Sequence, residues 1–203
     1  MKVYYFDLGL YKGVELGWMV DRILPSLGVS NFEAYGFEAC HSYATKLQKK
    51  YSNNSKVHIV NKAISNTSGK QKLYHAGNLL GHSIFATKRN VTSKYEEVDG
   101  IVFSDWLMEN IKDYKESLII MKVNIEGAEW HLFNDLVSNQ ISHHVDIYCG
   151  AGHDVEKISE LADRVEEYYQ LLKENNIFLH RFSEYMPHKN ANLSKMIGEK
   201  YVF

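Results

Sequence analysis

The sequence has few cysteines, few prolines and no long apolar run. Its only two cysteines, Cys40 and Cys149, lie far apart and lack the spacing of a metal site. They are expected to be free thiols in a reducing compartment, although a single disulfide between them stays open. No segment approaches the roughly 18 apolar residues that span a bilayer, and no signal-peptide pattern precedes the first apolar segment. We therefore expect a cytoplasmic protein without a membrane span.

A strong charge of either sign is also missing. The 203 residues include 23 lysines and arginines and 25 aspartates and glutamates, which gives a formal net charge of −2. Nucleic-acid binding relies on basic residues that neutralise phosphates, so bulk attraction to nucleic acid is not expected, and only a local basic patch stays open. Because there are two prolines, no Gly/Ser linker and no internal repeat, a single domain is expected over residues 1–203.

What the sequence does contain is a regular alternation of strand-like and helix-like segments. Short apolar runs predict buried strands, and apolar residues at helical spacing predict amphipathic helices. We expect main strands at residues 3–8, 34–37, 57–64, 118–125 and 145–149, and helices at 15–24, 42–51, 104–113, 129–137 and 155–175. This order predicts an α/β protein with a doubly wound, mostly parallel sheet and helices on both faces.

Two departures from the simple alternation refine this fold. Short strand-like segments at 70–75, 83–87 and 97–103 predict a small β insertion over about 70–103. Segments 177–182 and 200–203 are expected to close the sheet as an antiparallel pair. Such a terminal pair is typical of the seven-stranded, Rossmann-like class I methyltransferase fold. Ser104 is the expected N-cap of the helix at 104–113.

Acidic or amide residues lie at or just after the ends of three of the predicted strands. Asp7 ends the first strand, Glu38 follows the second, and Asn124 ends the run Leu118-Ile-Ile-Met-Lys-Val-Asn124. In open α/β sheets, ligands bind outside the carboxyl ends of the strands. The sequence therefore predicts a polar ligand laid across this edge of the sheet.

The loop after the first strand has the pattern Asp7-x-Gly9-x-x-x-Gly13. Glycines permit a sharp turn and close approach of a ligand to the backbone, and the following helix offers amide donors. A dinucleotide fingerprint has no carboxylate before its first glycine, whereas an acid there suits an amino-bearing ligand such as the amino-acid end of S-adenosylmethionine. The alternative is an aspartate that only caps the turn. Glu38 is placed to accept hydrogen bonds from ribose hydroxyls, unless it is a solvated loop carboxylate.

Five motifs in order along residues 3 to 150 resemble the FkbM family of S-adenosylmethionine-dependent methyltransferases. They are Phe6-Asp-Leu-Gly9 with Gly13, Tyr35-Gly-Phe-Glu-Ala39, Asn61-Lys-Ala-Ile-Ser65 followed by Gly69, Ser104-Asp-Trp-Leu107, and Lys122-Val-Asn-Ile-Glu-Gly-Ala-Glu129. The last block is the most specific of them. The resemblance implies a class I methyltransferase fold and transfer of a methyl group to an oxygen, often on a sugar or glycosylated product.

The resemblance also implies roles for individual residues. Asp7, Gly9 and Gly13 would line the methionine and ribose of the cofactor, and Glu38 would bind the ribose hydroxyls. Asn61 and Ala63 would lie near the adenine. Asn124, Glu126 and Glu129 would face the transferred methyl group and the acceptor. Tyr11, within the glycine loop, would flank the cofactor or pack on an acceptor sugar. Two positions depart from the family pattern, which has aspartate at the place of Asn124 and Ala-Asn at the place of Leu10-Tyr11. An asparagine keeps an amide for hydrogen bonds but removes a carboxylate ligand, so a requirement for a divalent metal stays open.

A sugar hydroxyl becomes a good nucleophile only when a base takes its proton. Three residues are candidates for this base: His153, which follows the fifth main strand, and Glu126 and Glu129 after the fourth. Two of them also have a structural alternative. His153 or Asp154 would cap the helix expected at 155–175, and Glu129 would cap the helix that it begins. Glu126 and Glu129 compete for the role of base.

The sequence thus predicts an S-adenosylmethionine-dependent O-methyltransferase that acts on a sugar hydroxyl, on a glycan or a deoxysugar such as rhamnose. The alternatives are an O-methyltransferase of another small molecule and a non-catalytic module that binds cofactor or sugar. A nicotinamide-dependent oxidoreductase is disfavoured by Asp7, and an RNA methyltransferase by the absence of a basic run. A sugar or oligosaccharide acceptor is the expected partner. Family members often carry helices ahead of the first strand, so the chain is expected to be either a domain of a longer polypeptide or a compact version. In the first case an adjacent glycosyltransferase domain would be a natural neighbour.

Overall fold

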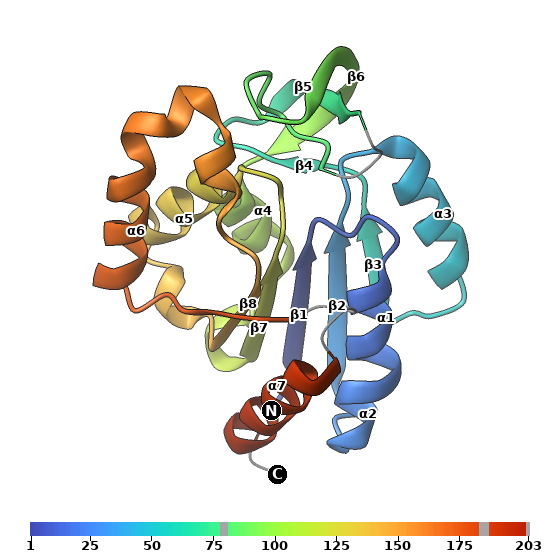
Figure 1. Ribbon diagram of the computed structural model, residues 1–203. Coiled ribbons are helices and arrows are strands. Elements are labelled where there is room, and N and C mark those ends of the chain that lie inside the picture. Colours follow the sequence, from blue (N-terminus) through green and yellow to red (C-terminus); the bar gives the residue numbers. More distant parts are fainter. Residues whose placement is uncertain (78–80, 183–186, 202–203) are drawn as a thin grey trace.

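The computed structural model describes residues 1–77, 81–182 and 187–201, the last segment without the side chains of 187–191. Within these residues, the central sheet has six strands in the order β3-β2-β1-β7-β8-β9 (Figure 1). Every neighbouring pair is parallel. The strands are β1 Val3–Leu8, β2 Phe32–Phe37, β3 Val57–Val60, β7 Leu118–Val123, β8 Ile147–Gly150 and β9 Leu179–His180. The expected α/β, Rossmann-like architecture with a mostly parallel sheet is confirmed, whereas the seven strands expected for the central sheet are not, since the described residues form six.

Helices cover both faces of the sheet, because side chains of successive strand residues point to opposite sides. Tyr4 and Phe6 of β1 belong to the core under α4 Phe103–Asn110, α5 Glu129–Ser138 and α6 Val165–Glu174. Val3 and Tyr5 belong to the core of the other face, which is covered by α1 Val14–Trp18, η1 Met19–Ile23, α2 Leu24–Ser26, α3 His41–Tyr51 and α7 Pro187–Lys200. Figure 1 shows the two helical layers on either side of the strands. No helix in the described part of the chain is both long and apolar enough to cross a membrane.

The predicted antiparallel closing pair is wrong. Of segment 177–182, two residues form β9, which runs parallel to β8. Lys200 lies in α7, and residues 202–203 are outside the described residues. The physical reason is the spacing of apolar residues before the C-terminus: Leu193 and Ile197 are four residues apart and both are buried on the α1–α2 face of the sheet. That spacing is helical.

Three other expected elements differ in detail. Segment 57–64 divides into β3 and β4 Ala63–Ile64, which belong to different sheets. The expected helix at 155–175 begins with two short 3₁₀ segments, η4 Asp154–Lys157 and η5 Ser159–Arg164, and becomes α-helical at α6. The expected helix at 15–24 contains the π-helical segment η1.

The expected Ser104 cap is also wrong. Helix α4 begins one residue earlier, at Phe103. Its start is held by Asp135 of α5, whose carboxylate accepts the backbone N–H of Ser104 at 2.9 Å and its hydroxyl at 2.5 Å. A side chain distant in sequence has therefore replaced the local cap.

The β insertion is present, but its strands differ from the predicted ones: the first lies where it was expected, the last begins earlier than expected, and the middle one is missing. It consists of β4, β5 Gly69–Ala76 and β6 Val91–Ile101 in the order β4-β6-β5. Segment 83–87 is not a strand, since only Ser83 makes a β-bridge, to Tyr74. Figure 1 shows this small sheet above the carboxyl ends of the central strands, where it covers the edge of the sheet.

Candidate active site

A cavity of about 310 Å³ lies at the carboxyl edge of the central sheet, under the insertion. Its walls come from the segments after β1, β2 and β7, from β4, and from residues 81–84 of the insertion. Six predicted site residues line it: Gly9, Tyr11, Glu38, Ala63, Asn124 and Glu126. Its volume falls in the range typical of small-molecule sites, which is about 300–1,000 Å³. The structure thus brings these six residues together at one edge.

Gly9 allows the loop after β1 to pack directly against the loop after β7. Its φ is +89°, and a Cβ at this position would lie 1.9 Å from the backbone oxygen of Asn124. Gly13 does not line the cavity. It has a φ of +65° at the start of α1 and donates its backbone N–H to Leu10 O at 2.7 Å, which closes the loop.

We expect Gly9→Ala to lower the free energy of unfolding by about 3 kcal/mol, because it adds left-handed backbone strain and a steric clash with a backbone atom. Gly69→Ala is the matched control, since Gly69 also has a positive φ of +116° but a Cβ added there would meet no atom within 4 Å. It should cost about 1–2 kcal/mol from backbone strain alone. Urea denaturation measures both values, and equal losses would contradict the packing argument.

Asp7 is fully buried and is not among the residues that line the cavity. Its carboxylate forms an ion pair at 2.9 Å with Lys122, its register partner on β7. Lys122 also donates to the backbone oxygen of Gly9 at 2.7 Å and reaches the cavity wall. Burial raises the pKa of Asp7, although Lys122 acts in the opposite direction. Asp7 therefore acts on the cavity through Lys122, which fixes the glycine loop.

Glu38 directly follows β2 at the cavity and holds two segments together. Its two carboxylate oxygens accept the backbone N–H groups of Tyr11 at 2.6 Å and Cys40 at 2.8 Å. Tyr11 has a φ of +50°, a left-handed conformation that such a bond helps to maintain. Burial raises the pKa of Glu38 to about 7, even though the backbone hydrogen bonds lower it. Each carboxylate oxygen keeps a free lone pair for a ligand hydroxyl.

Asn61 is not among the cavity-lining residues, but it contacts the backbone of two residues that are. Its amide donates to the backbone oxygens of Glu38 at 2.8 Å and Ala39 at 3.1 Å, and His41 Nδ1 lies 2.9 Å from its oxygen. Of the two residues predicted near the adenine, only Ala63 lines the cavity. Asn61 thus holds the end of β2 in place.

The three candidate bases have very different surroundings. Glu129 is fully buried, and its oxygens accept the backbone N–H groups of Ile125 at 2.9 Å and Gly127 at 2.5 Å. It holds the loop after β7, in the manner of a capping residue, and burial raises its pKa to about 7. His153 is exposed, precedes η4 and is not among the cavity-lining residues. Glu126 alone of the three lines the cavity.

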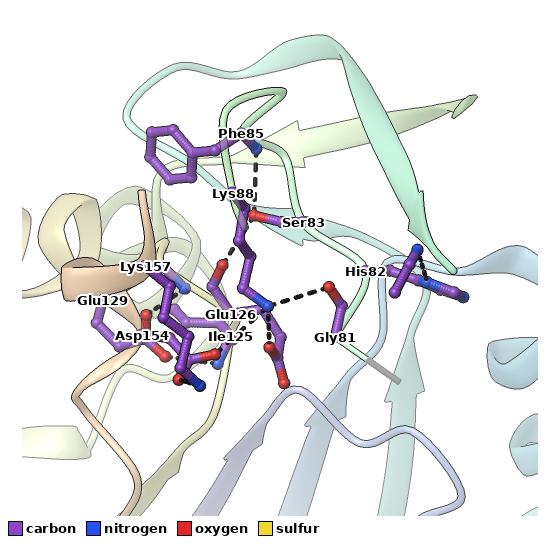
Figure 2. Close-up of polar contacts among 12 residues, drawn as sticks. Gly81, His82, Ser83, Phe85, Lys88, Ile125, Glu126, Glu129, Asp154 and Lys157 are labelled. Carbon is purple, nitrogen blue, oxygen red and sulfur yellow. Dashed lines mark hydrogen bonds and ion pairs between the residues drawn. The ribbon is translucent and has the colours of Figure 1, made fainter. Parts of the chain in front are cut away.

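Lys88 was not identified from the sequence, yet it contacts Glu126 directly. Its ammonium group lies 2.5 Å from a carboxylate oxygen of Glu126 and 3.4 Å from one of Asp154 (Figure 2). Burial and the nearby Asp154 raise the pKa of Glu126 to about 7, while Lys88 acts to lower it. No sequence signal distinguishes Lys88 from the other lysines of the insertion, since the contact depends on how the insertion folds back.

His82 is a second contribution of the insertion. Its Nδ1 accepts the backbone N–H of Ala76 at 2.9 Å, so in the neutral ring Nε2 carries the proton. Burial lowers the pKa of His82, with His75 acting in the same direction, which favours this neutral form. Since His82 lines the cavity, it is suited to donate a hydrogen bond rather than to act as a base.

Two further observations bear on cofactors and relatives. Among the residues with a described structure, no three His, Cys, Asp or Glu side chains are grouped so that they could hold a metal ion. Comparisons of the chain with protein-family models, with curated proteins and with solved structures found no match.

Proposed function

We propose that the protein is an S-adenosylmethionine-dependent O-methyltransferase that acts on a sugar hydroxyl, on a glycan or a deoxysugar such as rhamnose. One observation carries the proposal. Glu38 at the end of β2 and Glu126 after β7 line one cavity, on either side of the glycine loop that follows the intervening strand β1. This arrangement provides a carboxylate for a ribose and a second carboxylate for a reacting hydroxyl.

The cavity residues suit the parts of S-adenosylmethionine. Glu38 would accept hydrogen bonds from the ribose hydroxyls, and the backbone around Gly9 would allow close approach of the methionine part. Phe37, Ala63 and Ile64 give the wall after β2 and along β4 an apolar surface suited to a purine. When bound, S-adenosylmethionine supplies a methyl group already activated by the adjacent sulfonium.

The acceptor must then be positioned and deprotonated. Glu126 is the base that the geometry favours, because it alone of the three candidates lines the cavity. Glu129 is fully buried, and neither Glu129 nor His153 is among the cavity-lining residues. A carboxyl group with a pKa of about 7 is well matched to proton removal near neutral pH. His82 Nε2 would donate a hydrogen bond to another hydroxyl of the acceptor.

The proposal that the acceptor is a sugar has two supports. The first is the resemblance to FkbM methyltransferases. The second is the pair of cavity-lining rings Tyr11 and Tyr43, which meet edge to face with centroids 4.9 Å apart. Tyrosine combines an apolar ring face with a polar hydroxyl, as a sugar does, so the pair suits a ring that carries hydroxyl groups.

Calorimetric titration with S-adenosylhomocysteine tests the cofactor part. At pH 8, where a carboxyl group of pKa about 7 is mostly ionised, we expect micromolar binding by the wild type. Glu38→Gln should weaken it roughly 10- to 100-fold, because a hydrogen bond to a charged group is lost. Glu33→Gln is the matched control, since Glu33 lies near the opposite end of β2 and pairs with Lys2. No binding by the wild type would refute the proposal.

Methyl transfer tests the acceptor part. A panel of rhamnosides, other glycans and non-sugar hydroxyl compounds should be incubated with labelled S-adenosylmethionine. Label on a sugar is the expected result. Label only on non-sugar compounds would favour the other class of O-methyltransferase, and cofactor binding without any transfer would favour a non-catalytic module.

A further inference from the structure

The ammonium group of Lys88 is buried, with 1% of the side chain exposed, and oxygen atoms of three separate segments surround it. It donates to Gly81 O at 3.1 Å and Glu126 Oε2 at 2.5 Å, and it lies 3.4 Å from Asp154 Oδ2. Figure 2 shows it between the insertion and the loop after β7. A lysine ammonium has three N–H donors, so these oxygens can satisfy all of them.

The backbone around Lys88 is also anchored. Lys88 forms an antiparallel bridge with Ile158, and the backbone N–H of Arg89 donates to Lys157 O at 2.9 Å. The base of the side chain is therefore fixed against the segment after β8. Only its far end reaches toward the cavity, where 25% of the Glu126 side chain is exposed.

Glu126 is held by the insertion at two points. Its φ is +58°, a left-handed conformation that costs about 1–3 kcal/mol for a residue with a side chain unless surrounding contacts maintain it. Ser83 Oγ donates to its backbone oxygen at 2.7 Å, and Lys88 holds its carboxylate. Two residues of the same loop thus determine where this carboxylate lies.

We propose that Lys88 is a positioning residue, which holds the Glu126 carboxyl group at the cavity, favours its ionised form over the neutral one and couples the insertion to the loop after β7. The role of Glu126 in methyl transfer rests on the proposed function, but its contact with Lys88 does not. The acid thereby combines burial, which favours the neutral form, with an adjacent cation, which favours the charged form.

Several charged groups near Glu126 influence the pH at which it ionises. Lys88 is the positive neighbour in contact. Asp154 is a negative neighbour, itself paired with Lys157 at 2.6 Å, and Glu129 is a second buried acid in the same loop. Removal of Lys88 leaves Glu126 with Asp154 and Glu129, so ionisation of Glu126 should become harder.

The experiment is a carboxyl ¹³C NMR titration of the ligand-free protein labelled at glutamate, with Glu126→Gln used to assign the Glu126 signal. Lys88→Met should raise the midpoint of Glu126 by about one to three pH units, because an adjacent cation is lost. Lys88→Arg keeps the positive charge, so the midpoint of Glu126 should stay close to the wild-type value. Lys70→Met is the matched control: Lys70 lies in the same insertion, pairs with Asp99 at 2.8 Å and has a mostly exposed side chain. An unchanged midpoint in Lys88→Met would overturn the proposal.

A second variant covers the case in which Lys88→Met does not fold. Asp154→Asn removes the negative neighbour and leaves Glu126 as the carboxylate in contact with Lys88, so the midpoint of Glu126 should fall. A midpoint that stays or rises would contradict the proposal. The titration needs neither cofactor nor acceptor. It therefore separates this inference from the proposed function, which fails if the wild type does not bind S-adenosylhomocysteine.

Discussion

Replacing Lys122 with methionine is expected to lower the free energy of unfolding by about 3–5 kcal/mol, the usual cost of removing one partner from a buried ion pair. Asp7 would remain fully buried without its cation, and the backbone oxygen of Gly9 would lose its donor at 2.7 Å. Urea denaturation at constant pH measures the change. Because Lys122 fixes the glycine loop, weaker binding of S-adenosylhomocysteine should accompany the loss of stability.

Two controls separate the buried pair from the loss of a lysine in general. Lys2→Met removes the partner of Glu33 at 2.7 Å, but this pair is partly exposed and should cost no more than about 1 kcal/mol. The double variant Asp7→Leu/Lys122→Met replaces both charges with apolar groups and should recover much of the stability, because no unpaired charge stays buried. If Lys122→Met cost as little as Lys2→Met, the structural role assigned to the pair would be wrong.

Glu126→Gln is expected to lower the rate of methyl transfer by about 10²–10⁴-fold, the contribution typical of a positioned general base. The amide has nearly the same shape but cannot take a proton. In the wild type, the rate should rise with pH through about 7, since only the ionised carboxyl group acts as a base. The variant should lose this dependence. Rates measured from pH 5 to 9 with the best acceptor of the panel give both results.

Binding and a matched variant complete this test. S-adenosylhomocysteine should bind Glu126→Gln about as tightly as the wild type, so that the loss lies in the chemical step. Glu97→Gln, an exposed position on β6 of the insertion, should leave the rate unchanged. A Glu126→Gln enzyme with nearly full activity would return the base role to His153, which is the remaining candidate with an accessible side chain.

Most of the fold followed from local patterns. The apolar runs that became β1, β2, β7 and β8 predicted the parallel sheet, because a strand covered on both faces is apolar at successive residues. The prediction failed at the C-terminal end, where the helical spacing of Leu193 and Ile197 was missed. It also failed at Ser104, whose helix is held by Asp135 from another helix.

The sequence by itself determined which edge of the sheet carries the polar residues. Asp7 is the penultimate residue of β1, Glu38 and Asn124 directly follow β2 and β7, and parallel strands place such ends together. Only the tertiary structure decided what each residue faces. Asp7 is turned to Lys122, Glu129 to backbone amides, and Glu126 to the cavity and Lys88. Strand order and spacing are local properties of the chain, whereas burial and charge pairing depend on segments that meet only after folding, such as the insertion that brings Lys88 to Glu126.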